Sequence, residues 1–178
     1  VTPGASGALL LVMGALLEKQ KQVLLADPGY PCNKHFARFV EGRVNSIPVN
    51  ANNQYQLTAQ HIEQYWDDNT AMALVASPSN PTGTVLTQPD LKELAAAVAR
   101  KSGHLVVDEI YHGLTYDGFH APTALSVSDQ VFVVNSFSKF FGMTGWRLGW
   151  LMVPEGYTEV MDKLAQNLFQ PCQILPLP

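Results

Sequence analysis

Short apolar runs alternate with longer amphipathic segments along this 178-residue chain. Six of the runs are apolar on both faces, as are the strands of a parallel sheet that helices cover on both sides. The predicted strands are Val23–Ala26, Val44–Val49, Ala71–Ala76, Leu105–Asp108, Val131–Asn135 and Leu148–Val153. This alternation predicts an α/β fold of three layers (α/β/α), in which helices lie on both faces of a mainly parallel sheet.

A helical pattern recurs in four segments around these strands. The predicted helices are Ala5–Lys19, Ala59–Trp66, Pro89–Arg100 and Tyr157–Phe169. The third is marked best, because Thr87 can cap its first turn, Pro89 lies near its start and Gly103 can end it. The run GASGALLLVMGALL from Gly4 is the most apolar, but it is too short to span a membrane, so we expect a buried helix there.

Composition and charge indicate a globular protein with small-molecule partners. Hydrophobic residues make up 47% of the chain, which is enough for a core of ordinary size. The formal net charge is -4 and no run of Lys or Arg appears, so we expect neither nucleic acid nor a membrane as a partner. Cys32 and Cys172 lack metal-ligand spacing, so we predict no metal site and expect ordinary thiols in a reducing cytoplasm.

Polar residues follow several predicted strands, at the edge where α/β proteins usually place their chemistry. Asp108 closes the run Leu-Val-Val, where burial would raise the pKa of its carboxyl. It therefore needs a cationic partner or a hydrogen-bonding role, unless it only caps the following turn. Tyr111 can share a face with Asp108 or be a core tyrosine. Asn80 is held extended before Pro81, so its amide either points into a cleft or belongs to a structural turn.

Cations and small residues gather at two further places. The segment NSFSKFFGMTGWRLGW holds Lys139 and Arg147 in surroundings that look buried, where a charge is costly unless it is paired or has a task. Arginine suits a bidentate grip on a phosphate, whereas a lysine in a dry pocket can attack a carbonyl; alternatively, Lys139 is an ordinary surface lysine. TPGASGALL presents free N–H groups before an apolar helix, which suits either a phosphate or an N-capped core helix.

Taken together, these motifs resemble the class I/II aminotransferases, fold-type I enzymes that use pyridoxal 5'-phosphate. The resemblance covers nearly the whole chain, in the family's order, through GASGAL at Gly4, DPGYP at Asp27, SNPTG at Ser79, VDEIY at Val107, SFSK at Ser136 and GWRLGW at Gly145. It implies an aminotransferase-like large domain. It also implies transfer of an amino group from an amino acid to a 2-oxo acid through a Schiff base on Lys139, and assembly as a homodimer.

The resemblance implies a role for each matching position. Lys139 is similar to the lysine that holds the cofactor and moves the substrate proton, and Asp108 is similar to the carboxylate that pairs with the pyridine nitrogen. Tyr111 and Asn80 resemble the pair that binds the cofactor's phenolic oxygen, and Tyr30 resembles the aromatic residue that stacks on its ring. The residues implied to hold the phosphate are Ser136, Ser138, Arg147 and the backbone at Ser6, Gly7 and Ala8.

The chain departs from the family pattern toward its ends. No residue matches the family's arginine for the substrate α-carboxylate, which belongs to a smaller C-terminal domain. We therefore expect residues 1–169 to be an incomplete cofactor-binding domain, 170–178 an atypical or truncated tail, and the small domain to be absent. Two alternatives stay open: another pyridoxal-phosphate reaction, such as β-elimination or a synthase reaction, and a regulator's domain that binds the cofactor or an effector without turnover.

Overall fold

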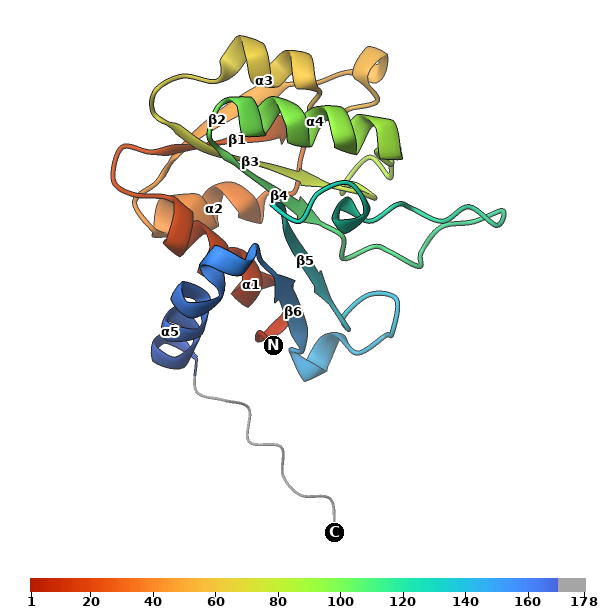
Figure 1. The fold of residues 1–178 in the computed structure, drawn as a ribbon. Coiled ribbons are helices and arrows are strands. Elements are labelled where there is room, and N and C mark those ends of the chain that lie inside the picture. The colour runs from red at the N-terminus through yellow and green to blue at the C-terminus, as the bar shows by residue number, and fades with distance from the viewer. Residues whose placement is uncertain (170–178) are drawn as a thin grey trace.

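The computed structural model describes residues 1–169, which form a six-stranded sheet covered by helices (Figure 1). The strands are β1 (Gln22–Asp27), β2 (Arg43–Pro48), β3 (Thr70–Ala76), β4 (His104–Asp108), β5 (Phe132–Ser136) and β6 (Gly149–Met152). Their order across the sheet is β2-β1-β3-β4-β5-β6. Strands β1 to β5 run parallel, and β6 pairs antiparallel to β5 at one edge. The predicted mainly parallel sheet is confirmed.

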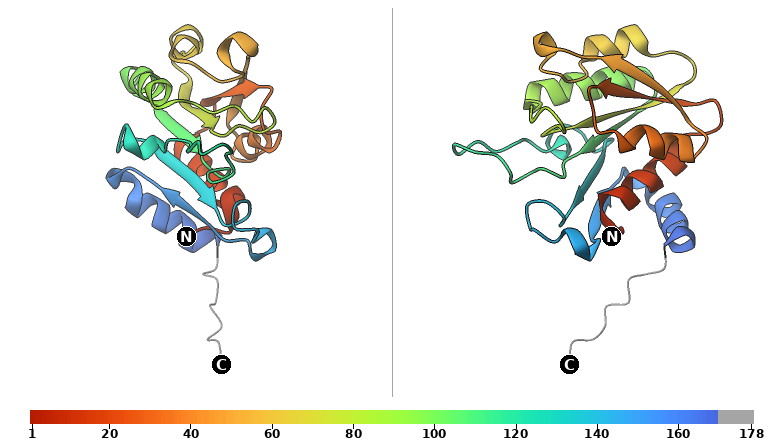
Figure 2. Two further views of the ribbon diagram at one scale, coloured as in Figure 1. Left: turned by 90° about the vertical axis from the view of Figure 1, so that its right-hand side faces the viewer. Right: turned by 180° about the vertical axis from the view of Figure 1, so that it is seen from behind.

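Helices lie on both faces of this sheet, as Figure 2 shows from two further sides. They are α1 (Gly4–Leu16), α2 (Cys32–Phe39), α3 (Ala59–Tyr65), α4 (Gln88–Arg100) and α5 (Thr158–Leu168). Neighbouring strand residues point to opposite faces. Leu24 therefore packs in a core with α3 and α4, whereas Val23 and Leu25 pack in a second core with α1, α2 and α5. The three-layer arrangement is confirmed.

The predicted elements are all present, and no bound differs from its prediction by more than three residues. The first helix ends at Leu16 instead of Lys19, because Leu17 is already extended and buried. Helix α2 was not predicted; the turn formers Pro28, Gly29 and Pro31 that precede it favour a loop, and the helix is only eight residues long.

The predicted signals at the start of α4 are confirmed, and Gly103 closes its end together with Ser102. Thr87 Oγ1 accepts a hydrogen bond from the Asp90 N–H at 3.3 Å, and the Asp90 carboxylate accepts one from the Thr87 N–H at 2.9 Å, which makes a capping box. After the helix, Ser102 takes the left-handed conformation (φ 53°), and the Gly103 N–H donates to the Val98 carbonyl at 3.1 Å. A glycine is also needed at position 103 because a Cβ there would collide with the ring of Trp66.

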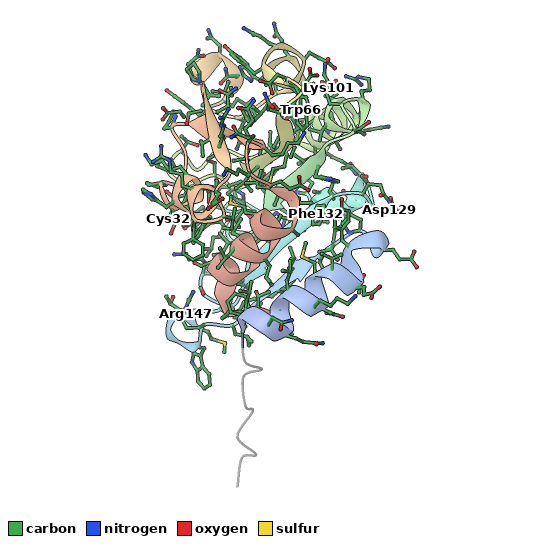
Figure 3. All side chains as sticks on the ribbon, turned by 90° about the vertical axis from the view of Figure 1, so that its left-hand side faces the viewer. Cys32, Trp66, Lys101, Asp129, Phe132 and Arg147 are labelled. Carbon is green, nitrogen blue, oxygen red and sulfur yellow. The ribbon has the colours of Figure 1, made fainter. Side chains whose placement is uncertain are left out.

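The carboxyl ends of the parallel strands meet at one edge of the sheet. Figure 3 shows Cys32 and Arg147, which follow β1 and β5, on one side of the molecule. Trp66, Lys101 and Asp129, which precede β3, β4 and β5, lie on the opposite side. Residues that follow strands are thereby brought together although they are far apart in sequence. Within residues 1–169 no helix is long and apolar enough to cross a membrane, and the tail from Gln170 lies outside the described residues.

Candidate active site

A cavity of about 90 Å³ opens at this carboxyl edge. It is lined by Ala5, Ser6, Leu9, Tyr30, Ala76, Asn80, Asp108, Ile110, Tyr111 and Lys139. A wider hollow of about 260 Å³ adjoins it and shares Tyr30, Ala76 and Asn80 with it. The hollow lies between the carboxyl ends of β1 and β3, because β2 lies on one side of β1 in the sheet and β3 lies on the other. Open α/β sheets bind ligands at such a switch point. The tertiary structure thus gathers Ser6, Tyr30 and the predicted residues of three strand ends around one opening.

Asp108 is the buried charge of the cavity. Asp108 is the last residue of β4 and is 7% exposed. Its Oδ1 accepts a hydrogen bond from the Ile110 N–H at 3.0 Å. Burial raises the pKa of this carboxyl from 3.8 to about 6, against the opposing effects of the Ile110 N–H and the Lys139 ammonium. The bond to Ile110 shows that the predicted turn cap exists. One backbone bond does not offset the burial, so the carboxyl remains suited to a cationic partner in the cavity.

Asn80 and Tyr111 meet across the cavity. The Asn80 Nδ2 donates to the Tyr111 hydroxyl at 3.3 Å, so both polar groups face one point and neither is only a turn or core residue. The Lys139 Nζ lies 5.6 Å from the centre of the Tyr111 ring, within the range of a cation–π contact. The lysine therefore stands beside the pair of residues with which it was predicted to act.

Tyr30 forms another wall of the cavity, between the cavity and the wider hollow. It is 38% exposed, and a side-chain hydrogen bond with Cys32, together with burial, raises the pKa of its hydroxyl to about 12. Its ring is thus held neutral and partly uncovered, as a stacking surface requires.

An anion-binding arrangement lies at the amino end of α1. This helix has no side-chain cap, and the N–H groups of Ala5 and Ser6 at its start have no helical acceptor. Of the three implied backbone positions only Ser6 has a free N–H group, since those of Gly7 and Ala8 make the first hydrogen bonds of the helix. The Arg147 guanidinium is placed against the same turn, since a Cβ on Gly4 would collide with it. Gly4 itself has a φ of 73°, which favours glycine. Backbone donors and a cation therefore converge on one point.

The loop after β5 orients this guanidinium. Arg147 Nη1 donates to the Thr144 carbonyl at 3.0 Å and to Ser138 Oγ at 3.4 Å, and Thr144 Oγ1 donates to the Ser138 carbonyl at 2.6 Å. The Ser138 N–H donates to Ser136 Oγ at 3.1 Å. Ser136 and Ser138 are both buried, and the Ser138 hydroxyl oxygen faces the guanidinium.

The expectation that Lys139 and Arg147 lie in a buried segment is wrong for the described residues, in which both are exposed. The apolar residues that suggested burial belong partly to β5 and β6, whereas Phe140, Phe141 and Trp146 are themselves more than half exposed. Gly142 and Gly145 have open space around them, as in a surface loop. The two cations therefore reach the site from its rim.

Three residues of the site were not found from the sequence. The Thr144 carbonyl orients Arg147, and Cys32 forms a side-chain hydrogen bond with Tyr30. Glu109 anchors the loop that follows Tyr111. Thr144 lies in the connection after β5 and Cys32 begins α2, and a short polar side chain is unremarkable at either place. Glu109 carried a signal, because an acid directly after a buried strand and beside Asp108 needs its own partner.

The comparison with known proteins agrees with the geometry. The family model described as aminotransferase class I and II matches residues 1–176. The chain belongs to the class I and II aminotransferases. It is 39% identical over 168 residues to the valine–pyruvate aminotransferase of Mycobacterium tuberculosis, covering 94% of this chain and 43% of that protein. It is 34% identical to a probable N-acetyl-LL-diaminopimelate aminotransferase of Bacillus subtilis, covering 93% of this chain and 42% of that protein.

Solved aminotransferase structures share the fold. A crystal structure of an aminotransferase from M. tuberculosis aligns with a TM-score of 0.88 at 40% identity, over 93% of this chain and 43% of the other. A tetra mutant of Thermus thermophilus aspartate aminotransferase aligns with a TM-score of 0.87 at 29% identity, over 93% and 46%. The chain thus spans less than half the length of these relatives.

Class I and II aminotransferases depend on pyridoxal 5'-phosphate, and the described residues fit this group. The buried Asp108 carboxyl suits a protonated ring nitrogen, and the bare amino end of α1 with Arg147 suits a phosphate. Lys139 supplies the primary amine that such an aldehyde requires.

Proposed function

We propose that this chain carries the cofactor-binding and catalytic centre of an aminotransferase that moves an amino group from an amino acid to a 2-oxo acid. The observation that carries the proposal is the convergence of Lys139, Asp108 and the Asn80–Tyr111 pair on one cavity. The α1 end with Arg147 supports it, because an anion site beside that cavity gives the cofactor both of its attachments.

In this proposal each residue has one task. Bound pyridoxal phosphate supplies an electron-withdrawing ring that stabilises negative charge at the substrate's α-carbon. Asp108 keeps a proton on the ring nitrogen, and Asn80 and Tyr111 bind the phenolic oxygen. The Lys139 Nζ holds the cofactor at rest and, once freed, takes the proton from the α-carbon and returns it.

Further residues bind without moving protons. Tyr30 covers one side of the ring. The groups that bind the phosphate are Arg147, the hydroxyls of Ser136 and Ser138, and the amino end of α1 at Ser6, Gly7 and Ala8.

We also propose that the substrate enters through the wider hollow beside Tyr30 and Asn80. Its lining includes the charged residues Lys34 and Asp27, which suits a charged amino acid or oxo acid. The relatives are named for valine and pyruvate, aspartate, and N-acetyl-LL-diaminopimelate, which supports an amino acid as donor and does not single one out.

Self-association and cellular location are further parts of the proposal. Tyr116, Phe119, Phe140 and Trp146 are at least half exposed and lie on loops that follow β4 and β5. Exposed aromatic residues of this kind are enriched at protein interfaces, which supports a homodimer that buries them. The free thiol of Cys32 supports a reducing compartment, for which we propose the cytoplasm.

Cofactor labelling tests the proposal directly. Pyridoxal phosphate is added to the purified chain, the absorbance spectrum is recorded, and borohydride reduction is followed by peptide mapping. We expect visible absorption and a reduced adduct on Lys139. The variant Lys139→Ala should lose both, whereas Lys92→Ala, which removes an exposed lysine of α4, should keep them.

Turnover with several amino acids and 2-oxo acids follows. A new oxo acid with conservation of the amino group supports transamination, whereas release of ammonia would indicate elimination. An adduct scattered over surface lysines would contradict the proposed role of Lys139.

A further inference from the structure

Glu109 is a buried acid beside the candidate active site to which the proposed reaction gives no task. It is 4% exposed and directly follows Asp108 at the end of β4. Its backbone N–H continues the sheet by donating to the Val134 carbonyl at 2.8 Å. A buried carboxylate of this kind is costly unless hydrogen bonds compensate its lost hydration.

Both carboxylate oxygens of Glu109 have partners in the connection between β4 and β5. Oε1 accepts from the Ala124 N–H at 2.7 Å and from Thr123 Oγ1 at 3.0 Å. Oε2 lies 3.4 Å from His112 Nδ1. Burial raises the pKa of Glu109, and the Ala124 N–H, His112 and Thr123 act against that rise. Glu109 therefore ties both ends of this connection, near 112 and near 124, to the edge of the sheet.

The tied connection is long and projects from the body of the protein on the right of Figure 1. Its tip includes the exposed Tyr116 and Phe119. His112 Nε2 is buried without a hydrogen-bond partner among residues 1–169, so the ring's only polar contact there is with Glu109. Without the Glu109 carboxylate, His112 and the Ala124 N–H would lose the group that they share at the base of the connection.

The base of the connection touches the candidate site at two points. Tyr111, whose hydroxyl accepts the hydrogen bond from Asn80, precedes His112. Gly113 has a φ of 87°, and a Cβ on it would lie 2.5 Å from the ring of Phe140, the residue after Lys139. Position 113 thus packs directly on the segment that carries the lysine.

Glu109 also acts on the site through its charge. Burial is the main cause of the raised pKa of Asp108, and the negative charge of Glu109 raises it further, whereas Lys139 lowers it. The groups that face Asp108 are therefore Glu109, Lys139 and the Ile110 N–H, and only Glu109 among them adds negative charge.

We propose that Glu109 is a positioning residue of the active site, which fastens the β4–β5 connection so that Tyr111 and the Lys139 segment keep their places, and which places a negative charge beside Asp108. The description as an active site rests on the proposed function. The two effects themselves are properties of the chain and can be measured without cofactor.

Two substitutions separate the two effects. Glu109→Gln keeps an oxygen that accepts from the Ala124 N–H but removes the charge, so the titration of Asp108, followed by NMR of its ¹³C-labelled carboxyl, should move to lower pH. Glu109→Ala removes the acceptor as well, so the Ala124 amide should exchange with solvent about tenfold faster or more, as the loss of a charged hydrogen bond predicts. Glu93→Gln, at an exposed position of α4, is the matched control and should change neither quantity.

Every outcome decides the proposal. If Glu109→Ala does not fold, the titration in Glu109→Gln still carries the test. Faster exchange at Ala124 with an unchanged titration of Asp108 would make Glu109 only a cap of the turn at Ala124, and would overturn the proposal. Because both measurements use the chain without cofactor, they stand even if pyridoxal phosphate fails to label Lys139.

Discussion

Asp108→Asn should stabilise the chain without cofactor while removing a group that the proposed reaction requires. The carboxyl is buried, and its pKa is raised from 3.8 to about 6 by that burial. Asparagine has nearly the same shape, and its Oδ1 can still accept the hydrogen bond that the Ile110 N–H donates at 3.0 Å. The substitution therefore removes an unfavourable ionisation and leaves the local geometry in place.

The size of the effect follows from the linkage between protonation and folding. Between these two pKa values the folded chain binds a proton at Asp108 that the unfolded chain has released, so stability falls as pH rises through this range. The full difference corresponds to about 3 kcal/mol, since one pKa unit is about 1.4 kcal/mol. From about pH 4.5 to about pH 8, Asp108→Asn should gain about 2 kcal/mol relative to the unchanged chain.

Urea unfolding of both chains at the two pH values measures this gain. Other titrating groups are common to the two chains, so the change in their difference isolates Asp108. Equal differences at both pH values would refute the reasoning, because they would show that the burial of Asp108 does not disfavour its ionised form. A loss of stability at the higher pH would show instead that the ionised carboxylate has a favourable partner in the folded chain.

Three further substitutions test a helix cap, a close backbone contact and a buried histidine. Thr87→Ala should lower the free energy of unfolding in urea by about 1 kcal/mol, because it removes the capping box of α4. Gly149→Ala should lower it by about 1–3 kcal/mol, since the new Cβ would lie 2.7 Å from the Gly4 carbonyl carbon. His104→Phe should flatten the acid dependence of thermal unfolding: burial lowers the pKa of His104 from 6.5, so below that pH the unfolded chain binds the proton more tightly and stability is lost.

Each of these predictions has its contradicting result. An unchanged urea midpoint in Thr87→Ala would mean that water replaces the cap at no cost. Gly156→Ala, at a glycine with nothing within 4 Å, is the control for Gly149 and should be far milder; equal losses would refute the packing argument. A His104→Phe chain that loses stability in acid as steeply as the unchanged chain would assign that loss to other groups.

A residue of the candidate site was predictable wherever its neighbours in the sequence form a recognisable motif around it. Asp108 ends an apolar run, and Lys139 lies between small residues after another, so both positions follow from local pattern and from the family resemblance. The exposure of Lys139 and Arg147 was not predictable, because apolar neighbours such as Phe140 and Trp146 look the same in a core and on a surface loop. Helix α2 was also missed, since its stability comes from packing of Phe36 and Ala37 on the core more than from local signals.

By itself the sequence determined the strands, most helices and the identity of the residues that carry chemistry, because periodicity, capping and motif spacing act over a few residues. Only the tertiary structure decided which of those residues meet. The order β2-β1-β3-β4-β5-β6 puts the hollow at the β1–β3 switch point, and the packing of Gly4 on Arg147 brings position 147 to the first turn of the chain. Such contacts depend on strand order and on close approach between distant segments, which no local pattern encodes.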